Sequence, residues 1–359
     1  MAHLSLIGSE MQKNDRIIGV DIAKIVAMLL VVALHINGFG LTYVSDKPPG
    51  LGYLLLRSSL DATFGACINI FAIASGYVGI MSSFRFSRII RLWIQVVFTG
   101  LTVLVCLDFL LGVDVDIKDY FKACVPVGTR QYWYITAYFM LCFVAPLINA
   151  GIKALDEKGL RHILLLLLCV ICGESFACSA GALGVEGGYS FEWLVVLYVV
   201  GAYIRLYNLQ RQSKWALLGC VCSCAMIVGW GPHILRKLAL LIGVCYPRLI
   251  EFGGYTSPFT VVIAFCIFVL CLRVRIESGI ARRVITFLSS TTLGVYLIHV
   301  QPVFFRNVFI GGVRKLTVTG GGGYLCSIIF VTVAVFIVCV ILDSLRIVIC
   351  SSVKRLMTK

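Results

Sequence analysis

Three titratable residues lie within the first long apolar segment of the chain: Asp21, Lys24 and His35. A titratable side chain at membrane depth costs free energy and usually marks a functional site. On a helix that turns about 100° per residue, the step from Lys24 to His35 closes to within about 20° of three full turns. Asp21 falls on the same face. We therefore expect this face to look into a helical bundle or a water-filled cavity.

Other interpretations of these residues remain open. Asp21 and Lys24 are one turn apart near the expected cytoplasmic end, so they could form a local ion pair at the interface. His35 could be an interfacial hydrogen-bonding residue, although its alignment with Lys24 favours a catalytic or ligand-binding role. A neutral imidazole, with an ordinary pKa of about 6.5, is the only side chain on this face suited to act as a base.

A second group of candidates is the basic sequence Arg85-Phe-Ser-Arg88-Ile-Ile-Arg91. Arg88 and Arg91 share one helix face and could bind two phosphates or one diphosphate. The positive-inside rule would also place arginines in a cytoplasmic loop without any ligand, and the spacing alone does not decide between the two. Ser75-Gly-Tyr77 precedes this loop, and its glycine permits close backbone approach.

Five residues are weaker candidates for substrate contact or support. Arg130 and Trp133 lie in an aromatic stretch that opens a predicted span, and Glu174 is an isolated acid in an apolar segment. Tyr296 and His299 stand at i, i+3 shortly before a proline. The sequence has no phosphate-binding loop of the Gly-Lys-Ser/Thr type and no Gly-x-Ser-x-Gly elbow. It has no metal-ligand spacing either, so we expect no metal and no bound cofactor.

The composition indicates a polytopic membrane protein. Of the 359 residues, 60% are hydrophobic and 13% are charged, and the mean hydropathy is +0.98. Soluble domains carry about a quarter of their residues as charged side chains, so this chain cannot cover a soluble globule. Disordered, collagen-like, coiled-coil and disulfide-scaffold classes are excluded by the same values. The net charge of +14 is spread between apolar segments, without the basic-aromatic face of a nucleic-acid-binding protein.

The positioning elements are predicted from apolar segments of about 20 residues, the length that crosses a bilayer. We predict an all-α bundle of about ten transmembrane helices. The predicted spans are Ile17–Phe39, Ser59–Ser82, Ile89–Leu111, Trp133–Ile152, Ile163–Ser179, Phe191–Tyr207, Trp215–Trp230, Ser257–Leu272, Val284–Ile310 and Tyr324–Ile349. The stretch His233–Tyr255 has an apolar segment too short to cross, and we predict an interfacial or re-entrant helix there.

Lys and Arg in the connections predict the orientation. With the N-terminus inside, the cytoplasmic connections hold more basic residues than the opposite ones, so both termini are predicted to be cytoplasmic. Short tails are expected at 1–15 and 351–359. No connection is long enough to fold alone, so we expect residues 1–359 to form one membrane domain without an extra soluble domain. The first apolar segment is of full spanning length, so no cleavable signal peptide is expected.

The ordered set of motifs resembles the membrane acyltransferase 3 family. Lys24 and His35 resemble its first-helix signature, in which Arg or Lys precedes His by eleven positions, although Lys24 lacks the planar fork of the commoner Arg. The residues that resemble its other motifs are Phe71-Ala-Ile-Ala-Ser75-Gly-Tyr77, Arg88-Ile-Ile-Arg91, Trp133-Tyr and Gly294-Val-Tyr296-Leu-Ile-His299.

The resemblance implies an integral-membrane O-acyltransferase of the cytoplasmic membrane. It would move an acyl group, acetyl by family habit, from cytoplasmic acyl-CoA to a hydroxyl of a surface polysaccharide or lipid-linked glycan. His35 would act as base or acyl carrier together with Lys24, and Arg85, Arg88 and Arg91 would bind acyl-CoA. Membrane lipids, acyl-CoA and the glycan are the implied partners.

Two other classes of function compete with this interpretation. A transporter or flippase could use Asp21, Lys24, His35 and Glu174 as a proton or substrate path, and a non-catalytic scaffold would leave the polar face without a role. The absence of a half-chain repeat, and the Arg-x-x-Arg motif together with the Lys24–His35 spacing, favour the acyltransferase.

Overall fold

The computed structural model describes residues 16–40, 50–177, 183–244, 252–316 and 321–357, and within these ranges the regular structure is entirely helical. The longer helices are α2 (Ile18–His35), α3 (Leu51–Gly79), α4 (Phe86–Leu111), α6 (Trp133–Ala154), α7 (Glu157–Ala177), α8 (Phe191–Tyr207), α9 (Lys214–Leu241), α10 (Pro258–Leu272), α11 (Gly279–His299) and α14 (Gly321–Met357). The shorter ones are η1 (Ile36–Gly40), α5 (Ile117–Cys124), η2 (Glu186–Gly188), η3 (Leu209–Arg211), α12 (Pro302–Phe304), η4 (Phe305–Phe309) and α13 (Ile310–Leu316).

Helices that could cross a membrane make up most of the described chain. Seven of them are long and apolar enough to span by themselves. An eighth span results if α11 and the segment Pro302–Leu316, which are bent by 60° at the intervening break, count as one. Helices α8 and α10 cover the remaining predicted spans but have only 17 and 15 residues. The chain is therefore an all-helical, multi-pass membrane protein, and the count of about ten spans stays a prediction.

The prediction for His233–Tyr255 is wrong in its first part. Helix α9 continues through Pro232 to Leu241, so His233 belongs to the preceding helix instead of starting a separate interfacial one. Proline removes only one backbone donor, and a long helix can continue past it with a local kink. The residues numbered 245–251 lie outside the described ranges. At the chain ends, the tail 1–15 is also outside them, whereas α14 extends through most of the expected tail 351–359.

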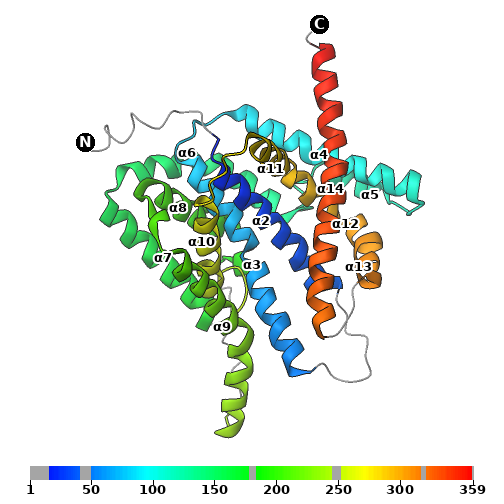
Figure 1. Ribbon diagram of the computed structural model, residues 1–359. Helices are drawn as coiled ribbons and strands as arrows, with labels where there is room; N and C mark the ends of the chain where they lie inside the picture. Colours follow the sequence, from blue (N-terminus) through cyan, green and yellow to red (C-terminus); the bar gives the residue numbers. More distant parts are fainter. Residues whose placement is uncertain (1–15, 41–49, 178–182, 245–251, 317–320, 358–359) are drawn as a thin grey trace.

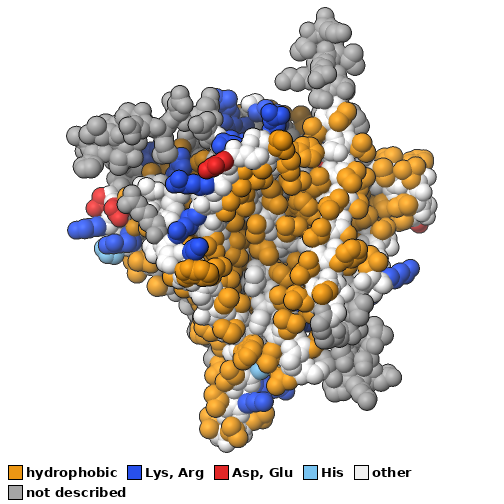
Figure 2. Space-filling model, in the orientation of Figure 1, with side chains coloured by type: hydrophobic (Ala, Val, Ile, Leu, Met, Phe, Trp, Pro, Cys, Tyr) orange, Lys and Arg blue, Asp and Glu red, His pale blue; other side chains and the backbone are white. Residues whose placement is uncertain are grey.

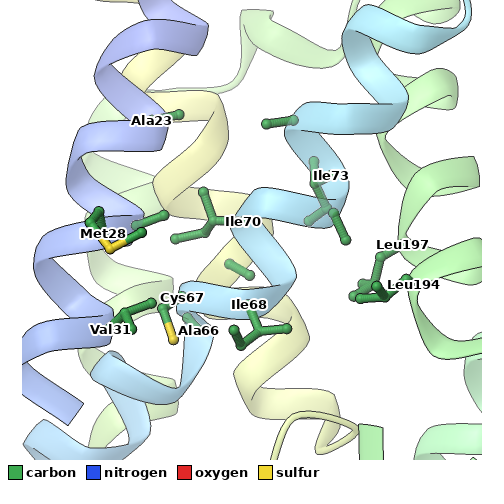
Figure 3. Close-up of a cluster of buried hydrophobic side chains, with 14 of the residues drawn as sticks. Ala23, Met28, Val31, Ala66, Cys67, Ile68, Ile70, Ile73, Leu194 and Leu197 are labelled. Atoms are coloured by element: carbon green, nitrogen blue, oxygen red, sulfur yellow. The ribbon is translucent and has the colours of Figure 1, made fainter. Parts of the chain in front are cut away.

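Helix α3 is the centre of the bundle and packs against α2, α8, α9 and α10. Figure 3 shows it between α2 and α8, with Met28 and Val31 of α2 on one side and Leu194 and Leu197 of α8 on the other. Gly76 lies against the backbone of α8, where a Cβ atom would overlap the carbonyl of Tyr198. Gly201 of α8 lies in the same way against α3. Glycine at both positions therefore lets the two backbones approach closely, as in other membrane helix pairs.

The surface of the bundle has a broad apolar belt, with most of the Lys and Arg side chains in view gathered toward one end (Figure 2). Helix α2 begins and α14 ends at this same end of the molecule (Figure 1). This arrangement is what a membrane protein needs, because apolar side chains face lipid tails and basic ones reach the headgroups. Which side of the membrane this end faces remains the prediction made above.

Candidate functional site

Two histidines from helices far apart in sequence meet at the predicted catalytic residue. His35 is the last residue of α2, where the chain changes from α-helix to the π-helix η1. Its Nδ1 lies 3.1 Å from Nε2 of His299, the last residue of α11. His299 is fully buried, whereas His35 is partly exposed. The weak candidate His299 is thus the direct partner of the residue with the strongest sequence signal.

The partners of His299 determine which nitrogens of the pair carry protons. Nδ1 of His299 lies 2.6 Å from the carbonyl oxygen of Val295, which can only accept, so this nitrogen donates. In a neutral ring Nε2 of His299 is then unprotonated and accepts a hydrogen bond from Nδ1 of His35. The second nitrogen of His35, Nε2, keeps its lone pair. This arrangement suits His35 to take up a proton through Nε2.

Phenylalanine side chains close one side of the histidine pair. Phe305 meets the His35 ring edge-on with centroids 5.4 Å apart, and Phe39 packs on Phe305. Phe309 stacks on Phe305 and lies 6.0 Å from the ring of His299. These rings give that side of the pair an apolar surface, and the His35 side chain lines a cavity elsewhere.

Three of the cavities among the described residues lie next to one another in the bundle, and each is named by its position or lining. The His35 chamber measures about 130 Å³ and is lined by Val31, Leu34, His35, Cys67, Ile68, Gln131, Tyr132, Trp133, Tyr255, Tyr296 and Val300. The middle chamber measures about 300 Å³ and is lined by Lys24, Met28, Val31, Ile68, Phe71, Ser75, Leu92, Gln95, Tyr134, Ile135, Tyr138, Ser289, Ser290, Thr292, Leu293 and Tyr296. The basic chamber measures about 610 Å³, and its polar lining is Ser75, Ser82, Ser83, Arg85, Arg88, Tyr138, Asn149, Lys153 and Tyr198.

The chambers form a series because neighbouring ones share walls. Ser75, Leu92 and Tyr138 line both the basic chamber and the middle chamber. Val31, Ile68 and Tyr296 line both the middle chamber and the His35 chamber. Along α2, Lys24 and His35 are separated by about 16 Å of helix axis. The three chambers therefore lie in one row between the arginines at one end and the histidine pair at the other.

The arrangement of the arginines differs from the predicted Arg88–Arg91 pair. Arg85 and Arg88 line the basic chamber, but Arg91 does not; its Nε donates to the carbonyl of Ser87 at 3.2 Å. Lys153, at the end of α6, completes the basic lining. Lys153 was not predicted, because a single lysine after an apolar segment is what the positive-inside rule alone would produce.

Comparison with known proteins identifies the family. A family model described as an acyltransferase domain matches residues 17–344, which is nearly the whole chain. The chain belongs to the membrane acyltransferase 3 family. This protein is therefore a membrane acyltransferase. The matched residues include the histidine pair and the lining of the three chambers. No curated protein and no solved structure matches the chain.

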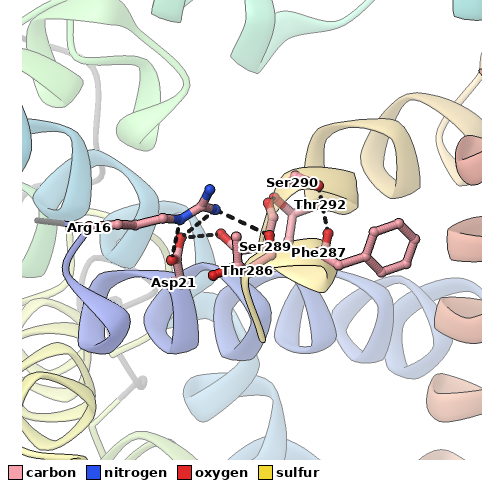
Figure 4. Close-up of polar contacts among 7 residues, drawn as sticks. All are labelled: Arg16, Asp21, Thr286, Phe287, Ser289, Ser290 and Thr292. Atoms are coloured by element: carbon pink, nitrogen blue, oxygen red, sulfur yellow. Dashed lines mark hydrogen bonds and ion pairs between the residues drawn. The ribbon is translucent and has the colours of Figure 1, made fainter. Parts of the chain in front are cut away.

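In the acyltransferase, Asp21 fixes the start of α2. Arg16 donates to both carboxylate oxygens of Asp21 at 2.6 and 3.0 Å and to the carbonyl of Thr286 at 3.1 Å. Ser289 of α11 donates to the same carboxylate at 2.6 Å (Figure 4). The carboxylate is buried and fully engaged, so among the described residues Asp21 pairs with Arg16 and not with Lys24. Its role is to tie α2 to α11, the two helices that end at the histidine pair.

Lys24 lies in the middle chamber, away from His35. Within the described part of the chain its ammonium group forms no hydrogen bond or ion pair. Lys24 and His35 line neighbouring chambers, so α2 places the two side chains at different points along the series and not at one reacting centre. Lys24 can therefore contact a ligand that passes toward His35.

In the Ser75-Gly-Tyr77 motif, the serine lines the chambers and the tyrosine does not. Ser75 lines both the basic and the middle chamber, and its hydroxyl donates to the carbonyl of Phe71 at 2.9 Å. Tyr77 is buried and points away: Arg205 of α8 donates to its hydroxyl at 3.1 Å and lies 4.9 Å over its ring. Tyr77 therefore ties α3 to α8, and Ser75 is the residue of this motif that a ligand can reach.

Of the four remaining candidates, two line the His35 chamber and two lie outside the three chambers. Trp133 and Tyr296 line the His35 chamber, and Trp133 stacks with Tyr255 at 6.0 Å. Arg130 is exposed and pairs with Glu186 at 3.1 Å, outside all three chambers. Glu174 is half-buried in α7 and lines none of the three.

Proposed function

We propose that the protein is an integral-membrane O-acyltransferase of the cytoplasmic membrane. It transfers an acyl group, acetyl in the simplest case, from cytoplasmic acyl-CoA to a hydroxyl of a surface polysaccharide or lipid-linked glycan. The observation that carries the proposal is the series of chambers between the Arg85–Arg88 rim and His35. Membership of the acyltransferase family supports the reaction class.

The acyl donor, acyl-CoA, fits the series of chambers in one orientation. Its phosphates suit the basic chamber, where Arg85, Arg88 and Lys153 supply charged donors. The flexible arm of the donor then passes through the middle chamber. This placement brings the thioester to the His35 chamber, while the acceptor hydroxyl arrives among the aromatic side chains of Trp133 and Tyr255.

The chemistry at His35 follows from the free lone pair on Nε2. The acceptor hydroxyl gives its proton to Nε2 while its oxygen bonds to the thioester carbonyl carbon. The carbon–sulfur bond then breaks, and the proton passes from Nε2 to the departing sulfur, which yields the ester and the free thiol. Tyr296, in the wall between the middle and His35 chambers, is the hydroxyl donor that we assign to the tetrahedral oxyanion.

His299 acts in this mechanism as a positioning residue that holds His35 in the tautomer with a free Nε2. We expect His299→Leu to lower kcat by about 10- to 100-fold, the usual cost of losing a partner that orients a reactive group. KM for acyl-CoA should stay the same, because His299 lines none of the three chambers. Steady-state kinetics on the purified protein measure both constants.

His299→Gln is the matched variant, because its side-chain oxygen can accept from Nδ1 of His35. It should keep more of the wild-type kcat than the leucine variant. Equal losses in the two variants, or a change in KM alone, would contradict the positioning role.

The function itself is tested with purified protein in sealed vesicles. Radiolabelled acetyl-CoA is added on the side where Arg85 is accessible, together with a lipid-linked glycan extracted from cell envelopes. We expect release of the CoA thiol that depends on the glycan, and label in an alkali-labile ester. Movement of the glycan across the membrane without thiol release or label would instead identify a flippase and refute the acyltransferase.

A further inference from the structure

The middle chamber holds two hydrogen-bond donors that have no acceptor among the residues that the structure describes. Gln95 of α4 lines this chamber, and its Nε2 atom is buried and without a hydrogen-bond partner in the described part of the chain. Lys24 lines the same chamber, and its ammonium group forms no hydrogen bond or ion pair with any described residue. A buried donor without an acceptor destabilises a protein, and at membrane depth the cost is larger. The buried donor of Gln95, with the half-buried ammonium group of Lys24 in the same cavity, therefore indicates a ligand that brings acceptors.

The position of the chamber limits what this ligand can be. It shares walls with the basic chamber on one side and with the His35 chamber on the other. If acyl-CoA binds with its phosphates at Arg88 and its thioester at His35, the segment between the phosphates and the thioester must pass through the middle chamber. In coenzyme A this part is the pantetheine arm, whose two amide carbonyls and one hydroxyl are hydrogen-bond acceptors.

Resting on the function proposed above, we propose that the middle chamber is the binding site of the pantetheine arm. The side-chain amide of Gln95 donates to one amide carbonyl of the arm, and Lys24 donates to a second acceptor along it. The walls supply apolar contact from Met28 and Leu92 for the carbon chain between these groups. In this site the arm, in addition to the phosphates, contributes to the affinity for acyl-CoA.

Gln95 and Thr99 form a natural pair for testing this site. Both lie on α4 one turn apart, and both carry a buried side-chain atom without a hydrogen-bond partner in the described ranges. Only Gln95 lines a chamber. Thr99→Val therefore removes an unpartnered polar atom from the same helix without touching the path of the ligand.

The experiment compares two ligands that share a headgroup. Calorimetry on the detergent-solubilised full chain measures Kd for coenzyme A and for adenosine 3′,5′-bisphosphate, which lacks the arm. Gln95→Met keeps the side-chain length and removes the donors. We expect this variant to bind coenzyme A about five- to tenfold more weakly and the bisphosphate as the wild type does. Thr99→Val should leave both values unchanged.

Each outcome bears on the proposal. If the ratio of the two Kd values in Gln95→Met equals that of the wild type, the arm site is wrong and the acyltransferase proposal stands. This holds whether both Kd values are unchanged or both rise by the same factor. Wild-type protein that binds neither ligand would overturn the proposed function and the arm site together. Because the ratio is taken within one variant, a reduced folded fraction does not alter it. Gln95→Leu, which also lacks the donors, replaces Gln95→Met if the latter does not fold.

Discussion

His35→Ala is expected to abolish acyl transfer while the protein still inserts and folds. The side chain lines the last chamber, and its Nε2 is the nitrogen of the histidine pair left free to take a proton. The other histidine at this place, His299, uses both nitrogens in hydrogen bonds and is fully buried. Loss of a general base lowers the rate by about two to four decades, so turnover should fall by at least that factor. The measurement is glycan-dependent thiol release by purified protein.

His35→Gln separates proton transfer from packing. Glutamine keeps a polar side chain at the end of α2 but cannot take up a proton, so this variant should fail as well. His162→Gln is the matched control, because His162 is exposed on α7 and lines none of the three chambers. Near wild-type turnover in His35→Gln would refute a role for His35 as base and equally as acyl carrier.

The sequence predicted the elements of this fold well because membrane helices are determined by local apolar composition. Phe191–Tyr207 was predicted with the bounds that the structure has, and α4 and α6 begin or end at the predicted residues. The break expected near His233 was wrong because proline and glycine weaken a helix without necessarily ending it. Whether a short helix such as α10 crosses the membrane depends on its neighbours and on lipid thickness, which composition does not encode.

The site was predictable only where a residue is unusual for its surroundings. His35 and Lys24 stand out as titratable groups in an apolar segment, and both line chambers. The partner of Asp21 was not predictable, because Arg16 and Ser289 reach it through the packing of α2 on α11. Lys153 was not predictable either, because a lysine directly after an apolar segment is common in membrane proteins.

Two glutamines were missed entirely because the residue type carries no signal of its own. Gln95 and Gln131 each have a buried polar atom without a partner in the described ranges, and each lines a chamber. What distinguishes them is unsatisfied hydrogen-bonding capacity inside a cavity, and only three-dimensional packing reveals that.

Replacing both Arg85 and Arg88 by alanine is expected to weaken coenzyme A binding by about one to three decades. A hydrogen bond to a charged group contributes about 1.5–3 kcal/mol, and the exposed position of both side chains at the chamber rim reduces this contribution. Because the contacts are electrostatic, Kd of the wild type should rise with salt, and the double variant should lose most of that dependence. Calorimetry at two ionic strengths measures both effects.

Arg91→Ala is the matched control for this pair. Arg91 belongs to the same helix and the same sequence motif, but it is exposed, donates to the backbone of Ser87 and lines none of the three chambers. Its removal should therefore leave Kd nearly unchanged, although the general positive charge of the loop falls by the same amount as for one of the other arginines. If Arg91→Ala weakens binding as much as Arg88→Ala, the loop attracts the donor by its overall charge and the basic chamber is not its specific site.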